Sequence, residues 1–167
     1  MNTRKATTTD IKAIMTMIKA VVPLMIASGN NQWDDAYPNE AVFEQDVMLG
    51  QLWIAEIDGE IAGVAAITTA QEPEYAQVGW DINQKAIVIH RLAVNPKFQG
   101  KGVAVSLMQQ AEKVAIQNQI DCLRVDTNSM NKATQKLFPK LGYVFVGEIT
   151  LEFRPGLIFY CYQKHIA

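Results

Sequence analysis

Two glycines and a lysine lie where an apolar run gives way to a helical pattern, in the stretch QGKGVA (residues 99–104). Gly100 and Gly102 can adopt left-handed backbone dihedrals and allow a ligand to approach the backbone closely. A helix start leaves N–H groups unpaired and concentrates partial positive charge, and Lys97 and Lys101 add charge nearby. The stretch therefore predicts a phosphate-binding turn. A tight strand-to-helix turn without a ligand is the alternative.

The spacing around this turn disfavours two common nucleotide sites. The pattern GxxxxGK[ST] of ATP-hydrolysing P-loops is absent, and GxGxxG is not met because residue 105 is valine. A nucleotide-binding protein that uses the turn differently stays open as an alternative. Nucleic acid is disfavoured as a partner, because the basic residues form no dense or aromatic-interleaved run.

Metal ligands and reactive thiols are sparse in this chain. It has two cysteines, Cys122 and Cys161, and two histidines, His90 and His165. None of them has the spacing of a metal site, so we expect no metal cofactor. Both cysteines are interpreted as buried, inert thiols.

Charge is distributed unevenly along the chain. No Lys or Arg occurs between residues 20 and 84, so this span carries −11, whereas the rest, with 15 basic and six acidic residues, carries +9. Solvated helix and turn faces would explain each acid singly. Together, the two parts suggest a cationic partner for one and an anionic partner for the other. The acids are Asp34, Asp35, Glu40, Glu44, Asp46, Glu56, Asp58, Glu60, Glu72, Glu74 and Asp81.

The composition is that of one folded domain, which we expect to span residues 1–167. Apolar residues make up 49% of the chain, and no low-complexity tract is present. The first ten residues are not followed by the apolar core of a secretory signal. The apolar runs are far shorter than the roughly 20 residues that cross a bilayer. We therefore expect a cytoplasmic protein with no membrane partner.

The apolar periodicity predicts a mixed α/β sheet with helices on both faces. A helix capped by Thr9 or Asp10 should end near Pro23, and a second should have Pro38 in its first turn and stop at Gly50. The dipeptide Asp58-Gly59 predicts a two-residue hairpin turn. Strands are expected at 2–7, 52–57, 60–67, 86–94, 122–127, 143–149 and 157–165, and further helices at 103–117 and 131–141.

Several motifs in this order resemble the GNAT superfamily of acyl-CoA N-acyltransferases. The stretch 99–104 is similar to the [QR]xxGx[GA] pyrophosphate loop, and HRLAVNP (90–96) is similar to the LAVxP strand before it. NKATQKLFPKLGY (131–143) resembles the NxxAxxLYxxLGF helix and strand, and FYCYQK (159–164) resembles the FxxYxK ending. The resemblance covers about residues 85 to 164. It implies a bacterial-type, single-domain GNAT fold, whose mostly antiparallel sheet splays between its fourth and fifth strands.

The resemblance implies acetyl-CoA as co-substrate. Backbone groups of Leu92, Ala93 and Val94 would pair with the pantetheine, and Asn131 would meet the cofactor through its amide unless it only caps a helix. Phe138 stands at a cofactor-contacting position where many relatives carry a tyrosine thought to protonate the leaving thiolate. The loop that would wrap the pyrophosphate consists of Gln99, Gly100, Lys101, Gly102, Val103 and Ala104.

Direct acyl transfer needs a neutral amine, a donor for the developing oxyanion and a route for the thiolate. The resemblance points to a strand N–H, at Leu92 or close by, as that donor. His90 is the first candidate for the base, since period-two spacing predicts that it shares a strand face with Leu92. A structural histidine within the sheet is the alternative. Phe138 cannot donate a proton, so water or a tyrosine (Tyr75, Tyr143 or Tyr162) is left as the acid.

Four aromatic residues fall in segments that the family uses for its acceptor pocket: Trp33, Tyr37, Tyr75 and Trp80. Aromatic faces among carboxylates favour an ammonium group, although core packing would also explain each ring. The expected activity is N-acetylation of a small cationic amine, such as a polyamine or amino sugar, or of a lysine side chain in a peptide. The alternative is a catalytically silent acyl-CoA-binding module. An edge-strand homodimer is the assembly that the resemblance suggests.

Overall fold

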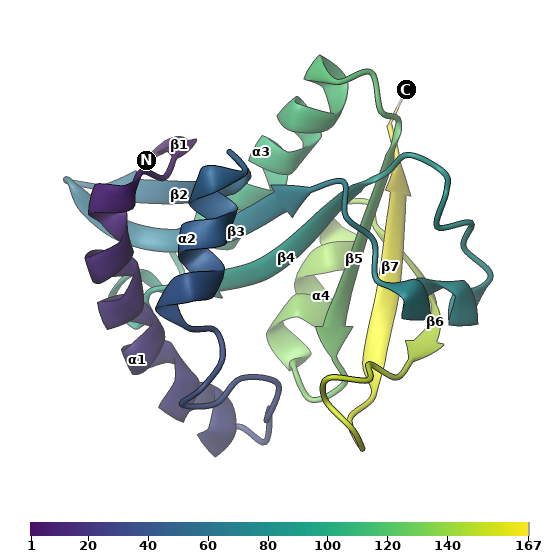
Figure 1. Ribbon diagram of the computed structural model, residues 1–167, viewed down its shortest axis with the longest axis horizontal. Coiled ribbons are helices and arrows are strands. Elements are labelled where there is room, and N and C mark those ends of the chain that lie inside the picture. Colours follow the sequence, from purple (N-terminus) through teal and green to yellow (C-terminus); the bar gives the residue numbers. More distant parts are fainter. Residues whose placement is uncertain (167) are drawn as a thin grey trace.

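The computed structural model describes residues 1–166 and contains a seven-stranded sheet of order β1-β2-β3-β4-β5-β7-β6 (Figure 1). The neighbours β4 and β5 run parallel, and the other neighbouring strands run antiparallel. This confirms the predicted mixed, mostly antiparallel sheet. The strands are β1 (Asn2–Lys5), β2 (Leu52–Ile57), β3 (Glu60–Thr68), β4 (Ile87–Val94), β5 (Cys122–Asn128), β6 (Val144–Ile149) and β7 (Phe159–His165).

Helices cover both faces of this sheet, as predicted. On one face, α1 (Ile11–Ala27) and α2 (Glu40–Met48) pack through Ile14 and Phe43. On the other, α3 (Val103–Gln117) and α4 (Lys132–Lys140) pack through Leu107 and Phe138, so the two cores are separated by the strands. Three short 3-10 helices complete the chain: η1 (Thr8–Asp10), η2 (Pro73–Val78) and η3 (Pro96–Phe98).

The predicted hairpin turn is confirmed between β2 and β3. Asp58 and Gly59 have φ of 51° and 79°, and they connect the paired residues Ile57 and Glu60. Positive φ at both central residues is the geometry whose twist matches that of the flanking strands.

Both proline-based helix boundaries were wrong. The first helix continues through Pro23 to Ala27. Pro23 and Lys19, the residue whose carbonyl loses its partner, are both exposed, so water can satisfy that carbonyl. The second helix begins at Glu40, because the side chain of Asn39 accepts a 3.0 Å hydrogen bond from the N–H of Val42 and caps the helix after Pro38.

The fourth and fifth strands separate along their length, which confirms the predicted splay. Residues 87–89 of β4 pair with residues 123–125 of β5. Beyond this point β4 continues beside β3 as far as Val94, while β5 continues beside β7 as far as Asn128. An opening therefore forms in the sheet between residues 90–94 and residues 126–128.

Candidate active site

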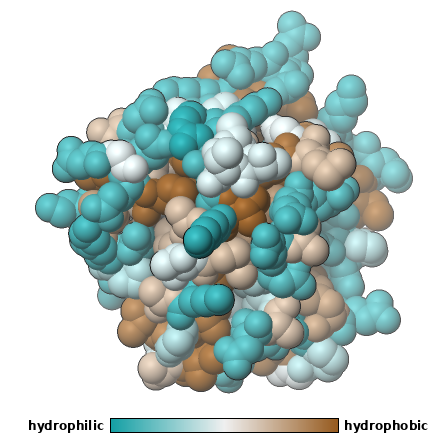
Figure 2. Space-filling model, turned by 60° about the vertical axis from the view of Figure 1, so that its left-hand side comes forward, coloured by the Kyte–Doolittle hydropathy of each residue, from teal (hydrophilic) through white to brown (hydrophobic). Residues whose placement is uncertain are grey.

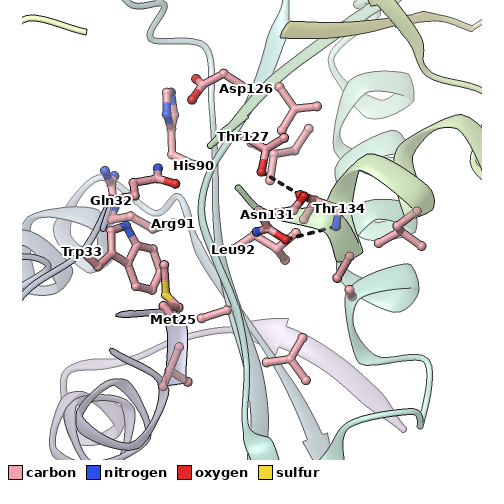
Figure 3. A pocket seen from close by; sticks show the side chains of 18 of the residues that line it. Met25, Gln32, Trp33, His90, Arg91, Leu92, Asp126, Thr127, Asn131 and Thr134 are labelled. Atoms are coloured by element: carbon pink, nitrogen blue, oxygen red, sulfur yellow. Dashed lines mark hydrogen bonds between the residues drawn. The ribbon is translucent and has the colours of Figure 1, made fainter. Parts of the chain in front are cut away.

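A cavity of about 430 Å³ lies at this opening and is lined from both faces of the sheet (Figure 3). What we call its α4 side is lined by Gln99, Ala104, Asn131, Thr134 and Phe138, among others. Its α1 side is lined by Leu24, Met25, Trp33, Tyr37 and Phe153, together with polar groups near β4. The β4 segment 89–94 runs between the two sides, so ligands entering from opposite faces can meet at this strand.

A β-bulge in β4 decides which side each of its residues faces. Ala66 of β3 pairs with His90 and Val64 pairs with Ala93, so two β4 residues stand opposite one β3 residue. The prediction that His90 and Leu92 share a face was therefore wrong, because the extra residue reverses the alternation. Figure 3 shows His90 beside Arg91 on the α1 side and Leu92 on the α4 side.

The bulge is built around an unusual backbone conformation. Arg91 has φ of 53°, which few residues with a side chain adopt. Its guanidinium donates to both carboxylate oxygens of the buried Asp46, at 2.7 Å from Nε and 2.6 Å from Nη2. This two-point pair with α2 holds the bulge in place.

The predicted phosphate-binding turn has the conformation that its glycines permit. Gly100 and Gly102 have φ of 76° and 79°, and Gly102 is the N-cap residue of α3, which therefore has no side-chain cap. The first N–H groups of α3 are consequently left for water or a ligand. Gln99 and Ala104, at the two ends of the turn, line the cavity. Of the nearby lysines, Lys101 is exposed and Lys97 is bound to Glu60 at 2.7 Å.

Polar side chains on the α4 side form a short chain of hydrogen bonds, drawn in part in Figure 3. Oδ1 of Asn131 accepts from the N–H of Thr134 at 3.2 Å, so Asn131 caps α4 and its amide NH₂ remains for a ligand. The hydroxyl of Thr134 donates to the carbonyl of Asn131 at 3.1 Å. Because its proton is used in this bond, the Thr134 oxygen accepts a hydrogen bond from the hydroxyl of Thr127, 2.7 Å away. Thr127 keeps lone pairs that can accept a donor in the cavity.

His90 is held in one tautomer on the α1 side. Its Nε2 lies 3.1 Å from the carbonyl oxygen of Ala70, and because a carbonyl only accepts, Nε2 must carry the proton. Nδ1 is then left as a base. Burial lowers the pKa of His90 below its usual 6.5, and the charge of Arg91 lowers it further, against the raising effect of the Ala70 bond. His90 is therefore neutral and able to accept a proton near pH 7.

Two carboxylates that sequence reasoning did not single out as site residues lie close to His90. Burial raises the pKa of Asp126 to about 6, although the phenol of Tyr75 donates to its Oδ2 at 2.6 Å and opposes the rise. Figure 3 shows the Asp126 carboxylate facing the His90 ring. Glu72 lines the same cavity, and burial raises its pKa too. Lone acids in buried strands, such as Asp126 in CLRVDT, are the sequence signal for such groups.

The predicted aromatic residues separate into two pairs. Trp33 and Tyr37 line the cavity on its α1 side. Tyr75 and Trp80 do not reach it; they are buried edge to face, 5.1 Å apart, with Tyr75 behind Asp126. These two rings therefore do not reach an acceptor in the cavity, because β5 residues lie between the rings and the cavity.

The tyrosines predicted as proton donors likewise lie outside the cavity lining. Tyr143 and Tyr162 pack against the buried ring of Phe138, with ring centroids 5.9 Å and 5.3 Å from it. Burial raises the pKa of both tyrosines above its usual value of 10. Neither tyrosine lines the cavity, so the α4 side offers hydroxyls of threonine but none of tyrosine.

The acids of the negatively charged span 20–84 lie almost entirely outside the cavity lining. Of the eleven acids between residues 20 and 84, Asp34, Asp46, Glu56 and Glu60 pair with arginine or lysine side chains. Among all eleven, Glu72 is the one that lines the cavity. The negative character of the site therefore comes from Glu72 and Asp126.

Residues 1–166 contain no group of three or more His, Cys, Asp or Glu side chains arranged to hold a metal ion. No helix in the same range combines the length and apolarity needed to cross a membrane.

Comparison with solved structures shows the same fold in other proteins. A GNAT-family acetyltransferase from Streptococcus agalactiae superposes with a TM-score of 0.86 at 27% identity, over 99% of this chain and 95% of that one. A Salmonella typhimurium protein, whose structure was determined with its cofactor acetyl-CoA, gives a TM-score of 0.70 at 20% identity over 99% and 94% of the two chains.

Sequence comparison finds relatives of the same kind. The uncharacterized N-acetyltransferase YesJ of Bacillus subtilis is 24% identical over 142 residues, 83% of this chain and 78% of its own length. The N-acetylaspartate synthetase of Xenopus tropicalis is 24% identical over 105 residues, 63% of this chain but 35% of its own length. The model of the acetyltransferase (GNAT) family matches residues 18–143. The chain belongs to this family and is an acyl-CoA N-acyltransferase.

Proposed function

We propose that this enzyme transfers an acetyl group from acetyl-CoA directly to a primary amine, with both substrates bound at once. The acceptor would be a small cationic amine or a lysine side chain. The observation that carries the proposal is the cavity at the splay, because it joins a glycine turn on the α4 side to the titratable groups His90 and Asp126 on the α1 side. The acetyl-CoA held by the Salmonella protein of the same fold supports the choice of donor.

The residues on the α4 side suit a long, anionic donor molecule. Unpaired N–H groups at the start of α3 would bind the diphosphate of CoA, in the turn formed by Gln99, Gly100, Lys101, Gly102, Val103 and Ala104. The free amide of Asn131 and the lone pairs of Thr127 would bind polar groups farther along. Backbone groups of residues 92–94 would pair with the pantetheine, and Phe138 would supply apolar surface. Acetyl-CoA itself supplies a thioester whose carbonyl carbon is open to attack.

The residues on the α1 side would accept and donate the protons of the reaction. The ammonium must lose a proton before the amine can attack, and Nδ1 of His90 would accept that proton, since Nε2 donates to the carbonyl of Ala70. The new C–N bond then replaces the C–S bond, and the thiolate takes a proton from water or from the imidazolium. The N–H of Leu92, next to the bulge, would donate to the thioester carbonyl oxygen as negative charge develops there. No tyrosine hydroxyl is needed, because a thiolate is a tolerable leaving group.

The charge of the site supports a cationic acceptor. Glu72 and Asp126 attract an ammonium ion, and Arg91 is already paired with Asp46. The Xenopus relative is named for N-acetylaspartate, so an amine acceptor that carries carboxylates is the competing case. Localisation in the cytoplasm and assembly as a homodimer stay predictions.

Thermal shift and thiol release together test this proposal. Acetyl-CoA and CoA should each raise the melting temperature, whereas ATP should not, because a ligand of the native state stabilises it by mass action. A panel of amines with acetyl-CoA should then release CoA thiol. In the variant His90→Gln, turnover should fall by about 10²- to 10⁴-fold with the acetyl-CoA shift retained. Binding of CoA without turnover on any amine would instead identify a silent acyl-CoA-binding module.

A further inference from the structure

We propose that the preferred acceptor is a monoamine with an apolar or aromatic body and no carboxylate. This inference rests on the proposed acetyl transfer and narrows its acceptor. It follows from the way apolar and charged groups are divided within the α1 side of the cavity. The sequence alone suggested polyamines and amino sugars, which are polar along their whole length.

The outer wall of the α1 side is mostly apolar, and Ser28 and Gln32 are its uncharged polar members. It is formed by Leu24, Met25, Trp33, Tyr37 and Phe153. Leu24 and Phe153 stay 55% and 46% exposed, values that are high for such residues and mark an unfilled apolar surface at the mouth. Figure 2, which turns the side bearing α1 forward, shows hydrophobic surface at its lower edge, at the height of the C-terminal end of α1 in Figure 1.

Two aromatic rings at this mouth are held in fixed positions. The rings of Tyr37 and Phe153 lie 5.9 Å apart. The guanidinium of Arg154 lies 5.4 Å from the first ring and 5.7 Å from the second, and it pairs with Asp34 at 3.5 Å. Arg154 is not part of the cavity lining, so it supports the rings and leaves their other surfaces to a ligand. A flat apolar body can pack there.

The acids of the cavity lie near His90. Among residues 1–166, Glu72 and Asp126 are the two acidic residues that line the cavity, and the charge of Asp126 contributes to the raised pKa of Glu72. Together with Nδ1 of His90 they can accept hydrogen bonds from one ammonium group. A second ammonium, as in a polyamine, would have to lie along the apolar wall, where desolvation is costly and no acid compensates.

An acceptor carboxylate also lacks a free cationic partner in the part of the lining that the structure describes. Arg91 reaches the lining, but both oxygens of Asp46 take up its guanidinium, and its Nη1 donates to the hydroxyl of Tyr37 at 3.3 Å. A carboxylate beside the reacting amine would instead face Glu72 and Asp126. Like charges within one buried cavity disfavour binding, so amino acids should be poor acceptors.

Four amines separate these contributions. 2-Phenylethylamine carries one ammonium and a ring, ethylamine lacks the ring, L-phenylalanine adds a carboxylate to the first, and spermidine adds charge in place of the ring. The value of kcat/KM for 2-phenylethylamine should exceed that of each of the others by about ten-fold or more, as expected from burial of one ring. Higher values for ethylamine, L-phenylalanine or spermidine would overturn the inference.

Variants test the two ends of the cavity separately. Phe153→Ala should lower the ratio of kcat/KM for 2-phenylethylamine to that for ethylamine by about three-fold or more, while the exposed control Met48→Ala on α2 keeps it. Glu72→Gln should raise KM for 2-phenylethylamine on the order of ten-fold, while Glu44→Gln does not. An unchanged ratio of kcat/KM in Phe153→Ala, or an unchanged KM in Glu72→Gln, would contradict the inference.

Failure of the inference and failure of the proposed function give different results. If acetyl-CoA raises the melting temperature and any primary amine releases thiol, acetyl transfer stands whatever the order of preference. If acetyl-CoA has no effect on melting and no amine reacts, the proposed function fails and the acceptor ranking fails with it.

Discussion

The phenol of Tyr75 donates a 2.6 Å hydrogen bond to Oδ2 of Asp126, a residue 51 positions later in the chain. This bond links the segment around η2 to the end of β5, where β5 has parted from β4. Tyr75 is fully buried and packs against Trp80, so the carboxylate is fixed from behind. Asp126 thus reaches the cavity with one oxygen held by the protein.

Replacing Tyr75 by phenylalanine should change the protonation of Asp126. The hydrogen bond opposes the effect of burial, so its loss should raise the pKa of Asp126 above about 6 and move the acidic limb of kcat/KM to higher pH. Stability should fall by about 1.5–3 kcal/mol, as for a bond to a charged group. A pH–rate profile and urea unfolding measure both effects. Tyr160→Phe, on β7 and outside the cavity lining, is the control; an unmoved limb in Tyr75→Phe would count against this role.

Asp126 should also make stability depend on pH. Its folded pKa of about 6 exceeds the ordinary 3.8, so its proton favours the native state; this contribution is complete below pH 3.8 and is lost as pH rises through 6. From pH 5 to pH 8, the wild type should lose about 1 kcal/mol through this group. Asp126→Asn should lack that loss. Urea unfolding at the two pH values measures it, and identical pH dependence in both proteins would refute the assignment.

The glycine turn before α3 should be sensitive to a single methyl group. Gly102→Ala forces a side chain onto φ of 79° and should cost about 1–2 kcal/mol of stability. It should also weaken CoA binding, because the turn presents the first N–H groups of α3. Gly59→Ala, at the same φ in the β2–β3 hairpin, should cost similar stability and leave CoA affinity unchanged. Calorimetric titration with CoA measures these affinities. Equal CoA affinities of the wild type and Gly102→Ala would show that the turn does not take part in CoA binding.

Two salt bridges should contribute different amounts to the free energy of unfolding. Asp46 is 2% exposed, so Asp46→Asn leaves Arg91 without a compensating charge and should cost about 3–5 kcal/mol. Glu60→Gln breaks an exposed pair with Lys97 and should cost about 0–1 kcal/mol. Thermal unfolding compares them. A mild effect of Asp46→Asn would mean that the bulge at Arg91 does not depend on this pair.

The parts of the fold that residue type encodes locally could be predicted from the sequence. The hairpin at Asp58-Gly59 and the turn at Gly100 and Gly102 both need positive φ, which these residues adopt readily. Helix ends at prolines were predicted less well. At Pro23 an exposed carbonyl tolerates the lost bond, and at Asn39 a side-chain cap sets the start instead.

The parts of the site that depend on tertiary contacts could not be predicted. The bulge places φ of 53° on Arg91, a residue type that gives no signal for it, and Asp46 stabilises it from 45 positions away. The bulge in turn separates the faces of His90 and Leu92. Asp126 follows an ordinary strand pattern, and its role depends on the splay and on Tyr75.

Steady-state kinetics with acetyl-CoA and an amine varied together tests the central claim, that β4 lies between two substrates bound at the same time. Direct transfer predicts intersecting double-reciprocal lines for a sequential mechanism and no acetylated enzyme when acetyl-CoA is added alone. Parallel lines, or an acetyl group left on the chain without an amine, would contradict the account.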